Sequence, residues 1–199
     1  MDVRSQILSE AIRLFAAQGF DGTSVQEIAD SVGIRKPSLL YHFASKEELR
    51  RSVLDEILSR WNDVLPHLLL TAAREQRFDK VMDALTQFFL QDPDRARLVL
   101  REMLDRPEDM RRRLETYVRP WIDVVAEQLE KAKAKGQVRA EVDTHAYAVN
   151  VINMVVAGVA ILESLPVVFA TDADPKRSKE RYIHELIRVA RRSLYTAAP

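Results

Sequence analysis

The chain has 199 residues, of which 47% are hydrophobic and 30% are charged, as in folded globular proteins rather than disordered ones. It contains no cysteine, which excludes a disulfide framework, a thiolate zinc site and a cysteine nucleophile. Its 30 basic and 30 acidic residues leave no net charge, so any attraction to nucleic acid must come from local clusters of charge. No apolar run approaches the roughly 20 residues of a membrane span. The first residues also lack the pattern of a signal peptide, so we expect a cytoplasmic protein.

The first element is an amphipathic helix over residues 3–18. Ile7, Leu8, Ala11, Leu14 and Phe15 recur at helical spacing and give it one apolar face. Glycine at position 19 is expected to end this helix.

Residues 23–46, TSVQEIADSVGIRKPSLLYHFASK, carry the signals of two short helices joined by a tight turn. Thr23 or Ser24 can open the first helix, because Gln26 and Glu27 follow at the spacing of a capping box. Gly33 fits a left-handed turn, and a proline at position 37 suits the start of the second helix. Ser45 opens a third helix in the same way. Two short helices around a glycine turn predict a helix-turn-helix, whose second helix would enter a DNA major groove.

The exposed side chains of this unit are candidate DNA contacts. No acidic residue occurs from Ser31 to Lys46, so the cations here have no nearby sequence neighbour of opposite charge. Hydroxyls and cations suit phosphates, whereas the first residues of the second helix are better placed for base edges. The candidate phosphate contacts are Thr23, Ser24, Tyr41, His42 and Lys46, and the candidate base contacts are Arg35, Lys36 and Ser38.

Residues 7–49 resemble the TetR family of one-component transcriptional regulators. The matching text is ILSEAIRLFAAQGFDGTSVQEIADSVGIRKPSLLYHFASKEEL, which includes the joint before the helix-turn-helix and the ending after it. Leu40 and Arg35-Lys36-Pro37 depart from the common family pattern, which puts the operator sequence in doubt rather than DNA binding. The resemblance implies an all-α fold with a three-helix DNA-binding domain over residues 1–46. Residues 47–199 would then form a helical domain for effector binding and dimerisation.

The remainder of the chain shows helical periodicity and no strand alternation. We expect helices over residues 45–65, 78–90, 95–104, 108–135, 144–165 and 176–196. Pro66 should break the first of these, Pro120 should kink or interrupt the fourth, and Gly136 should end it.

The last two helices carry apolar stripes that suggest a dimer interface, and glycine at position 158 would allow close approach. The alternative is that these stripes only complete the core within one chain; TetR-like proteins pair through their last helices, so the resemblance favours the dimer. The stripe residues are Val151, Val155, Gly158, Leu162, Ile183, Ile187, Ala190 and Leu194.

Aromatic side chains and methionines between helices can form a core or line an apolar pocket. TetR-like regulators bind small hydrophobic or amphipathic molecules, so the resemblance implies an effector site among such residues. Two asparagines in the apolar helix over 144–165 either bond to a neighbouring helix, which we favour, or contact the ligand. The candidate ligand residues are Trp61, Phe88, Phe89, Met103, Tyr117, Trp121, Asn150 and Asn153.

Catalytic and metal-binding signals are missing from the sequence. The four histidines lack zinc-ligand spacing, and neither a nucleophile elbow nor a phosphate-binding glycine loop occurs. We therefore expect no enzyme activity, no metal and no cofactor. The leading hypothesis is a homodimeric repressor that a small molecule releases from a near-palindromic, double-stranded DNA operator. The alternative is a helical small-molecule carrier without DNA activity.

Overall fold

A computed structural model describes residues 2–71, 77–169 and 174–196; the side chains of 61–71, 77, 166, 169 and 175 lie outside this description. Within these residues every regular element is a helix, which confirms the all-α prediction. The elements in order are α1 (Val3–Gly22), α2 (Val25–Val32), α3 (Lys36–His42), α4 (Lys46–Thr71), α5 (Arg77–Leu90), α6 (Pro93–Asp105), α7 (Pro107–Arg113), the π-helical turn η1 (Leu114–Val118), α8 (Arg119–Ala134), α9 (Thr144–Ala160), α10 (Pro166–Phe169) and α11 (Pro175–Leu194).

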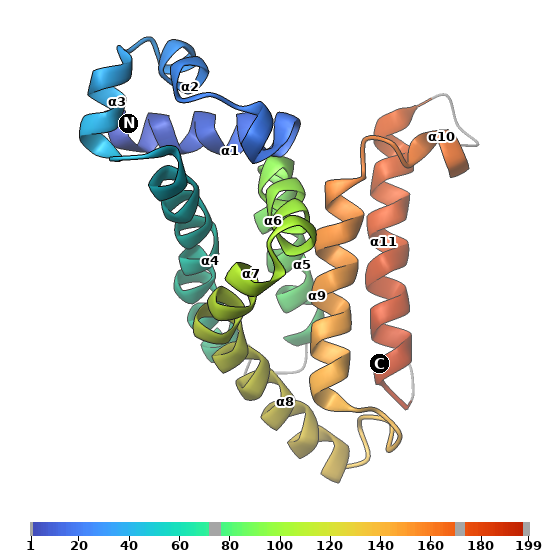
Figure 1. Ribbon diagram of the computed structural model, residues 1–199. Helices are drawn as coiled ribbons and strands as arrows, with labels where there is room; N and C mark the ends of the chain where they lie inside the picture. The colour runs from blue at the N-terminus through green and yellow to red at the C-terminus, as the bar shows by residue number, and fades with distance from the viewer. Residues whose placement is uncertain (1, 72–76, 170–173, 197–199) are drawn as a thin grey trace.

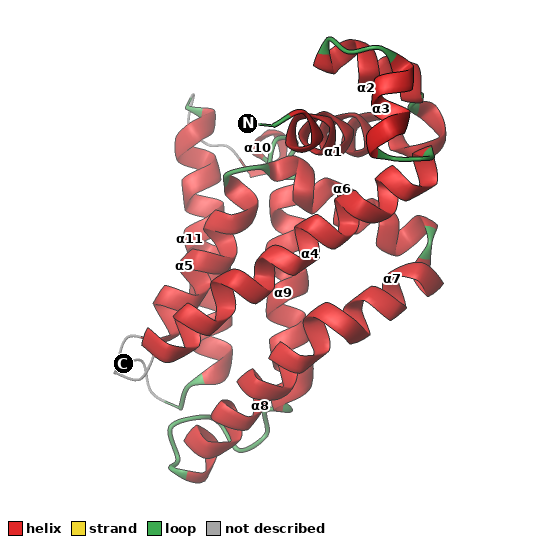
Figure 2. Cartoon of the chain, turned by 90° about the vertical axis from the view of Figure 1, so that its left-hand side faces the viewer, coloured by secondary structure: helices red, strands yellow, loops and turns green. Residues whose placement is uncertain are grey.

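Helices α1–α3 lie together at one end of the molecule, and α4 leads away from them (Figure 1, Figure 2). Helices α9 and α11 run side by side on the far side of α5 and α6 from α4 (Figure 1). Val138 and Tyr195 form an isolated antiparallel β-bridge, which ties the segment after α8 to the end of α11. No described helix is long and apolar enough to cross a lipid bilayer.

Local signals in the sequence fix the first three helices. Gly19 adopts φ 79° and interrupts α1, which resumes for one further turn to Gly22. Ser24 rather than Thr23 caps α2: its Oγ accepts from the Glu27 amide at 3.0 Å, and the Glu27 carboxylate accepts from the Ser24 amide. Gly33 has φ 77°, the left-handed conformation that glycine adopts at least cost, and ends α2 as predicted.

Two predicted helix ends lie five or six residues from the observed ends. Helix α4 continues through Pro66 to Thr71, so the predicted break is wrong. A proline inside a helix removes one backbone hydrogen bond, which a long helix can tolerate when the turns on both sides persist. Helix α9 ends at Ala160, well before the predicted end at Leu165, and a short turn leads from it to α10.

Pro120 interrupts the predicted 108–135 helix, as expected, and the interruption is a π-helical turn. Residues 114–118 form η1, and the Arg119 amide donates to the Leu114 carbonyl five residues earlier. Because proline has no amide hydrogen, Pro120 fits the first turn of α8, where no intrahelical donor is required. Gly136 follows with φ 70° near the end of α8, as predicted.

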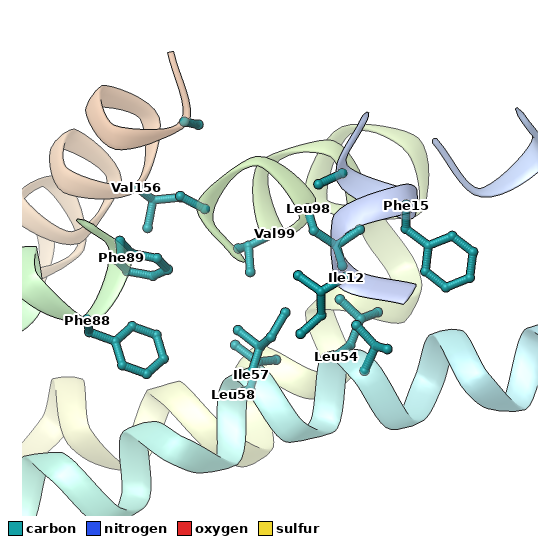
Figure 3. Packing of buried hydrophobic residues seen from close by; sticks show 14 of the residues in the cluster. Ile12, Phe15, Leu54, Ile57, Leu58, Phe88, Phe89, Leu98, Val99 and Val156 are labelled. Atoms are coloured by element: carbon teal, nitrogen blue, oxygen red, sulfur yellow. The ribbon is translucent and has the colours of Figure 1, made fainter. Parts of the chain in front are cut away.

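A continuous hydrophobic core joins the helix-turn-helix to the rest of the chain. Ile12 of α1 lies between Leu54 of α4 and Leu98 of α6 (Figure 3). The same cluster of buried residues extends through Phe89 of α5 to Val156 of α9 (Figure 3). The end formed by α1–α3 is therefore packed against α4 and α6 rather than suspended on a linker.

Candidate nucleic-acid interface

The turn between α2 and α3 leaves one face of α3 in solvent. Ala29 and Leu39 are fully buried, and the Ile34 amide donates to the Ala29 carbonyl at 3.0 Å across the turn. Because Leu39 points inward, the residues around it on α3 point outward. Tyr41 is 87% exposed, which is unusual for an aromatic side chain without a binding partner.

The predicted base contacts lie together at the start of α3. Arg35 is the N-cap residue of α3, and Lys36 and Ser38 occupy its first turn. All three side chains are exposed. Among the residues that the structure describes, no ion pair joins Arg35 or Lys36 to a carboxylate. Their charges are therefore free to attract an anion such as a DNA phosphate.

The predicted phosphate contacts divide into exposed and buried side chains. Tyr41 is exposed, and half-buried His42 packs edge-on against it at 5.5 Å between ring centroids. Ser24 is exposed, although its hydroxyl already caps α2. The Lys46 ammonium lies 4.2 Å from the centroid of the Phe20 ring, at the beginning of α4.

Thr23 does not belong to this exposed group. Its side chain is only 2% exposed, and its hydroxyl donates to the Gly19 carbonyl at 2.8 Å. This bond satisfies a carbonyl group at the interruption of α1. Thr23 therefore stabilises the joint between α1 and α2, and its buried hydroxyl cannot reach a phosphate in this conformation.

The candidate ligand residues come from several helices around the interior. Phe88 and Phe89 of α5 are buried, with ring centroids 5.0 Å apart in an edge-on arrangement. Met103 of α6 and Tyr117 of η1 are partly buried and pack against the core. Trp121 of α8 is also partly buried, and the Trp61 side chain lies outside the described residues.

Asn150 and Asn153 lie elsewhere. Both are exposed on the outer face of α9, so neither needs a partner inside the protein, and neither lies among the interior aromatic residues. Helix α9 is not buried all round, which removes the reason for expecting an internal hydrogen bond or ligand contact there.

The predicted dimer stripes face mainly inward. Ile183 and Ile187 are half-buried, and the other six residues are buried within the single chain: Val151, Val155, Gly158, Leu162, Ala190 and Leu194. Gly158 does permit close approach, because a β-carbon there would lie 2.9 Å from the Tyr182 hydroxyl of α11. That approach is intramolecular, so the buried stripe residues belong to the core of one chain.

A different set of apolar residues lies open on the same two helices. A shallow groove between α9 and α11 is lined by Met154, Ala157 and Ile161 on one side and by Val189 on the other. Ile161 is 46% exposed and Val189 is 45% exposed. The sequence missed this face because α9 is apolar on nearly every side.

Two family models match the chain. Residues 7–53 match the model described as bacterial regulatory proteins of the tetR family, and residues 99–165 match a tetracyclin repressor-like C-terminal domain. Among curated proteins, the chain is similar to IcaR of Staphylococcus aureus strain Newman, the negative transcriptional regulator of the biofilm operon icaADBC. The two are 34% identical over 89 residues, which span 45% of each chain. IcaR of Staphylococcus epidermidis is 38% identical over 63 residues, or 32% of this chain and 34% of that protein.

Solved structures share the fold over nearly the whole chain. The structure of AibR in complex with isovaleryl coenzyme A and operator DNA has a TM-score of 0.70 and 19% identity, covering 94% of this chain and 97% of AibR. The reduced form of Escherichia coli NemR has a TM-score of 0.69 and 18% identity, covering 100% of both chains. At these identities the likeness concerns the fold. The two family matches, over residues 7–53 and 99–165, show that the chain belongs to the TetR family of DNA-binding transcriptional regulators.

Proposed function

We propose that this protein is a homodimeric transcriptional repressor that a small molecule releases from a near-palindromic DNA operator. The observation that carries the proposal is the surface of α3, where exposed cations and an exposed tyrosine have no acidic neighbours from Ser31 to Lys46. A helix of this kind fits a major groove, and its first turn would meet the base edges.

The contacts with DNA divide by position. Arg35, Lys36 and Ser38 would read base edges, because they lie at the N-cap and in the first turn of α3. Tyr41, His42 and Lys46 would hold phosphates on either side of the groove. The Ser24 hydroxyl oxygen accepts a hydrogen bond in the cap of α2, so this residue would contact a phosphate only by donating its hydroxyl hydrogen. Thr23 would make no phosphate contact.

Dimerisation would use the open apolar face of α9 and α11 rather than their buried stripes. Met154, Ala157, Ile161 and Val189 expose apolar surface that a second copy would cover, forming a bundle of four helices. A twofold axis there would present two copies of α3 to successive major grooves, which accounts for a near-palindromic operator. A monomer mass in light scattering at micromolar concentration would contradict this part.

The effector would bind among the interior aromatic residues of α5, α6, η1 and α8. Phe88, Phe89, Met103, Tyr117 and Trp121 supply apolar and aromatic surface from four elements, and Tyr117 lies in a π-helical turn, a conformation frequent at functional sites. AibR, which is similar in fold, was crystallised with an acyl coenzyme A and operator DNA. Release needs a coupling between ligand and DNA of only ~1–3 kcal/mol.

Repression is favoured over activation because the similar Staphylococcus proteins are negative regulators. The division of labour would follow the predicted boundary, with residues 1–46 binding DNA and residues 47–199 binding the effector and the second copy. The protein would act in the cytoplasm, where its DNA lies.

The decisive experiment selects tightly bound duplexes from a random DNA pool. We expect a consensus of two inverted half-sites about one helical turn apart, with binding that weakens steeply as salt rises. Lys131→Ala serves as a control variant and should select the same consensus as the wild type. Lys131 is an exposed cation paired with Glu127 on α8, away from α3. Failure of the wild type to enrich any sequence would overturn the proposed function and favour a carrier.

A further inference from the structure

Arg50, near the start of α4, is the largest fully buried side chain that the structure describes. Its guanidinium bonds to Glu47 of α4, at 2.5 Å from Nη2 and 3.0 Å from Nε, and to Asp109 of α7 at 2.7 Å from Nη2. Nη1 donates to Glu102 of α6, which is itself 3% exposed. The Arg50 cluster, meaning Arg50 with Glu47, Glu102 and Asp109, thus joins α4 to the corner between α6 and α7.

Further arginines pair with the carboxylates of this corner. Arg106 lies 3.5 Å from Glu47, Arg112 lies 3.2 Å from Asp109, and Arg113 lies 2.9 Å from Asp109 and 3.2 Å from Asp55. Arg51 also lies 3.7 Å from Glu47, so five arginines face four carboxylates. Burial raises the pKa of Asp109, but hydrogen bonds from Arg50 and Arg112 outweigh this effect and lower it to about 2. Asp109 is consequently ionised, and holds Arg50, at every physiological pH.

The same corner contacts the DNA-binding end through Phe20. The centroid of the Phe20 ring lies 4.2 Å from the Lys46 ammonium, 4.5 Å from the Arg106 guanidinium and 5.8 Å from the Arg50 guanidinium. Cations favour the face of an aromatic ring. One ring in the last turn of α1 therefore contacts a predicted phosphate contact, Lys46, together with Arg50 of α4 and Arg106 of the α6–α7 corner.

Helix α6 makes a second contact with this end of the molecule. Nη2 of Arg101 lies 3.5 Å from the Ala16 carbonyl near the interruption of α1, where a cation suits the free carbonyl groups. A β-carbon at Gly19 would lie 3.0 Å from Nη1 of the same arginine. Arg101, in the second half of α6, thus contacts the region where α1 is interrupted.

We propose that Arg50 is a positioning residue for operator binding, which fixes Lys46 and α3 to the α6–α7 corner through Glu102 and Asp109. The proposal rests on the proposed DNA-binding function and adds residues that do not touch DNA. Burying an arginine and its carboxylate partners carries a large desolvation penalty, so such a cluster adds little to stability. The forked geometry of its hydrogen bonds, in contrast, defines one orientation of α4. When the orientation is no longer fixed, only a fraction of molecules presents α3 correctly, and the apparent dissociation constant rises by the inverse of that fraction.

The first test compares Asp109→Asn with Asp123→Asn. Asp123 lies on α8, is 54% exposed and, among the described residues, forms ion pairs with Arg119 and His145 alone, so it is a matched control. We expect Asp109→Asn to weaken binding to the selected operator about tenfold, because it removes one charge-assisted bond from the cluster. The slope of log K against log salt should stay unchanged, since no phosphate contact is lost, and Asp109→Glu should recover most of the affinity.

Two measurements serve as controls for folding: the thermal melting point of each variant and a titration of its active fraction. With these controls, loss of folded material is not counted as loss of affinity. Equal operator affinity of folded Asp109→Asn and wild type would overturn the proposal and leave the DNA-binding function intact. A wild type that binds no duplex would instead overturn the proposed function.

The second test needs no DNA and measures position directly. The chain has no native cysteine, so Gln26→Cys on α2 and Glu127→Cys on α8 can carry spin labels at two exposed sites. Labelled chains are mixed with an excess of unlabelled chains, so that the distance within one chain is observed. We expect a narrow distribution that broadens in Asp109→Asn and in Glu102→Gln but not in Asp123→Asn. Distributions of equal width in all four proteins would overturn the proposal.

Discussion

Cations in two neighbouring regions of this protein have opposite environments. On α3, Arg35 and Lys36 are exposed, and no acidic residue occurs from Ser31 to Lys46. At the start of α4, Arg50 is 2% exposed and bonded to three carboxylates. The two regions are adjacent in sequence and carry similar residue types.

The difference explains how a chain without net charge can attract DNA. A cation and a carboxylate in contact largely cancel each other's field at a distance, and salt screens what remains, with a Debye length of about 8 Å at physiological ionic strength. The Arg50 cluster therefore contributes little attraction to a phosphate, whereas unpaired cations on α3 keep theirs. Unpaired cations on α3 can thus attract DNA phosphates, while paired cations at the start of α4 hold the structure. In other DNA-binding proteins, a high net positive charge supplies the same attraction.

The largest effect should come from Arg50→Met, which leaves the buried carboxyl group of Glu102 without its charged partner. We expect the free energy of unfolding to fall by about 3–5 kcal/mol, as when other buried ion pairs lose one member. Urea denaturation measures this change. Arg35→Met is the comparison, because an exposed side chain without partners should change stability by less than about 0.5 kcal/mol. Similar losses in both variants would contradict the contrast between the two regions.

Arg35→Ala should lower the operator affinity and leave the stability nearly unchanged. We expect the operator affinity to fall by about 1–3 kcal/mol, with weaker discrimination at one base pair, because a base-edge contact is lost. Fluorescence anisotropy with the selected duplex and with single-base variants gives both quantities. Arg60→Ala is the control, since Arg60 is an exposed cation paired with Glu56 on α4. Uniform weakening on all sequences would assign Arg35 to a phosphate instead.

Lys46→Ala tests the border between the two regions, since Lys46 is near the Phe20 ring yet is a predicted phosphate contact. Loss of one phosphate contact per subunit should reduce the slope of log K against log salt by about one for each half-site. Binding isotherms at several salt concentrations measure the slope. An unchanged slope would mean that Lys46 belongs with the paired cations.

The smallest effect concerns pH. The pKa of Asp109 is lowered to about 2 in the folded protein from an ordinary value of 3.8, with the bonds from Arg50 and Arg112 outweighing burial. The stabilisation is therefore complete above the unfolded pKa and is lost as pH falls from about 4 towards 2. Melting temperatures over this range should fall less steeply for Asp109→Asn than for wild type. Parallel curves would show that Asp109 is not a principal acid-sensitive group.

The sequence predicted those features that depend on neighbours in the chain. The cap of α2 by Ser24, the left-handed turn at Gly33 and the interruption at Pro120 are each set within a few residues, so local patterns suffice. The surface of α3 follows from the same short-range geometry. Family likeness supplied the arrangement of the remaining helices.

Features that depend on distant contacts were missed or misplaced. Val155 faces the core rather than a second copy, because α9 is apolar on most sides and its periodicity does not select an outer face. The exposure of Asn150 and Asn153 was missed for the same reason. Only the Glu47–Arg50 pair of the Arg50 cluster is local; Glu102 and Asp109 come from other helices, and no spacing in the sequence points to them.

The π-helical turn η1 has a consequence for how the sequence can change over time. An i→i+5 turn holds one more residue than an α-helical turn, so it shifts the angular phase of α8 relative to α7 by about 100°. Deleting one residue from 114–118 would restore a regular helix and rotate Trp121 and Ile122 away from their present neighbours. A single codon gained or lost here would therefore exchange a whole set of inward-facing side chains, which point substitutions could replace only one at a time.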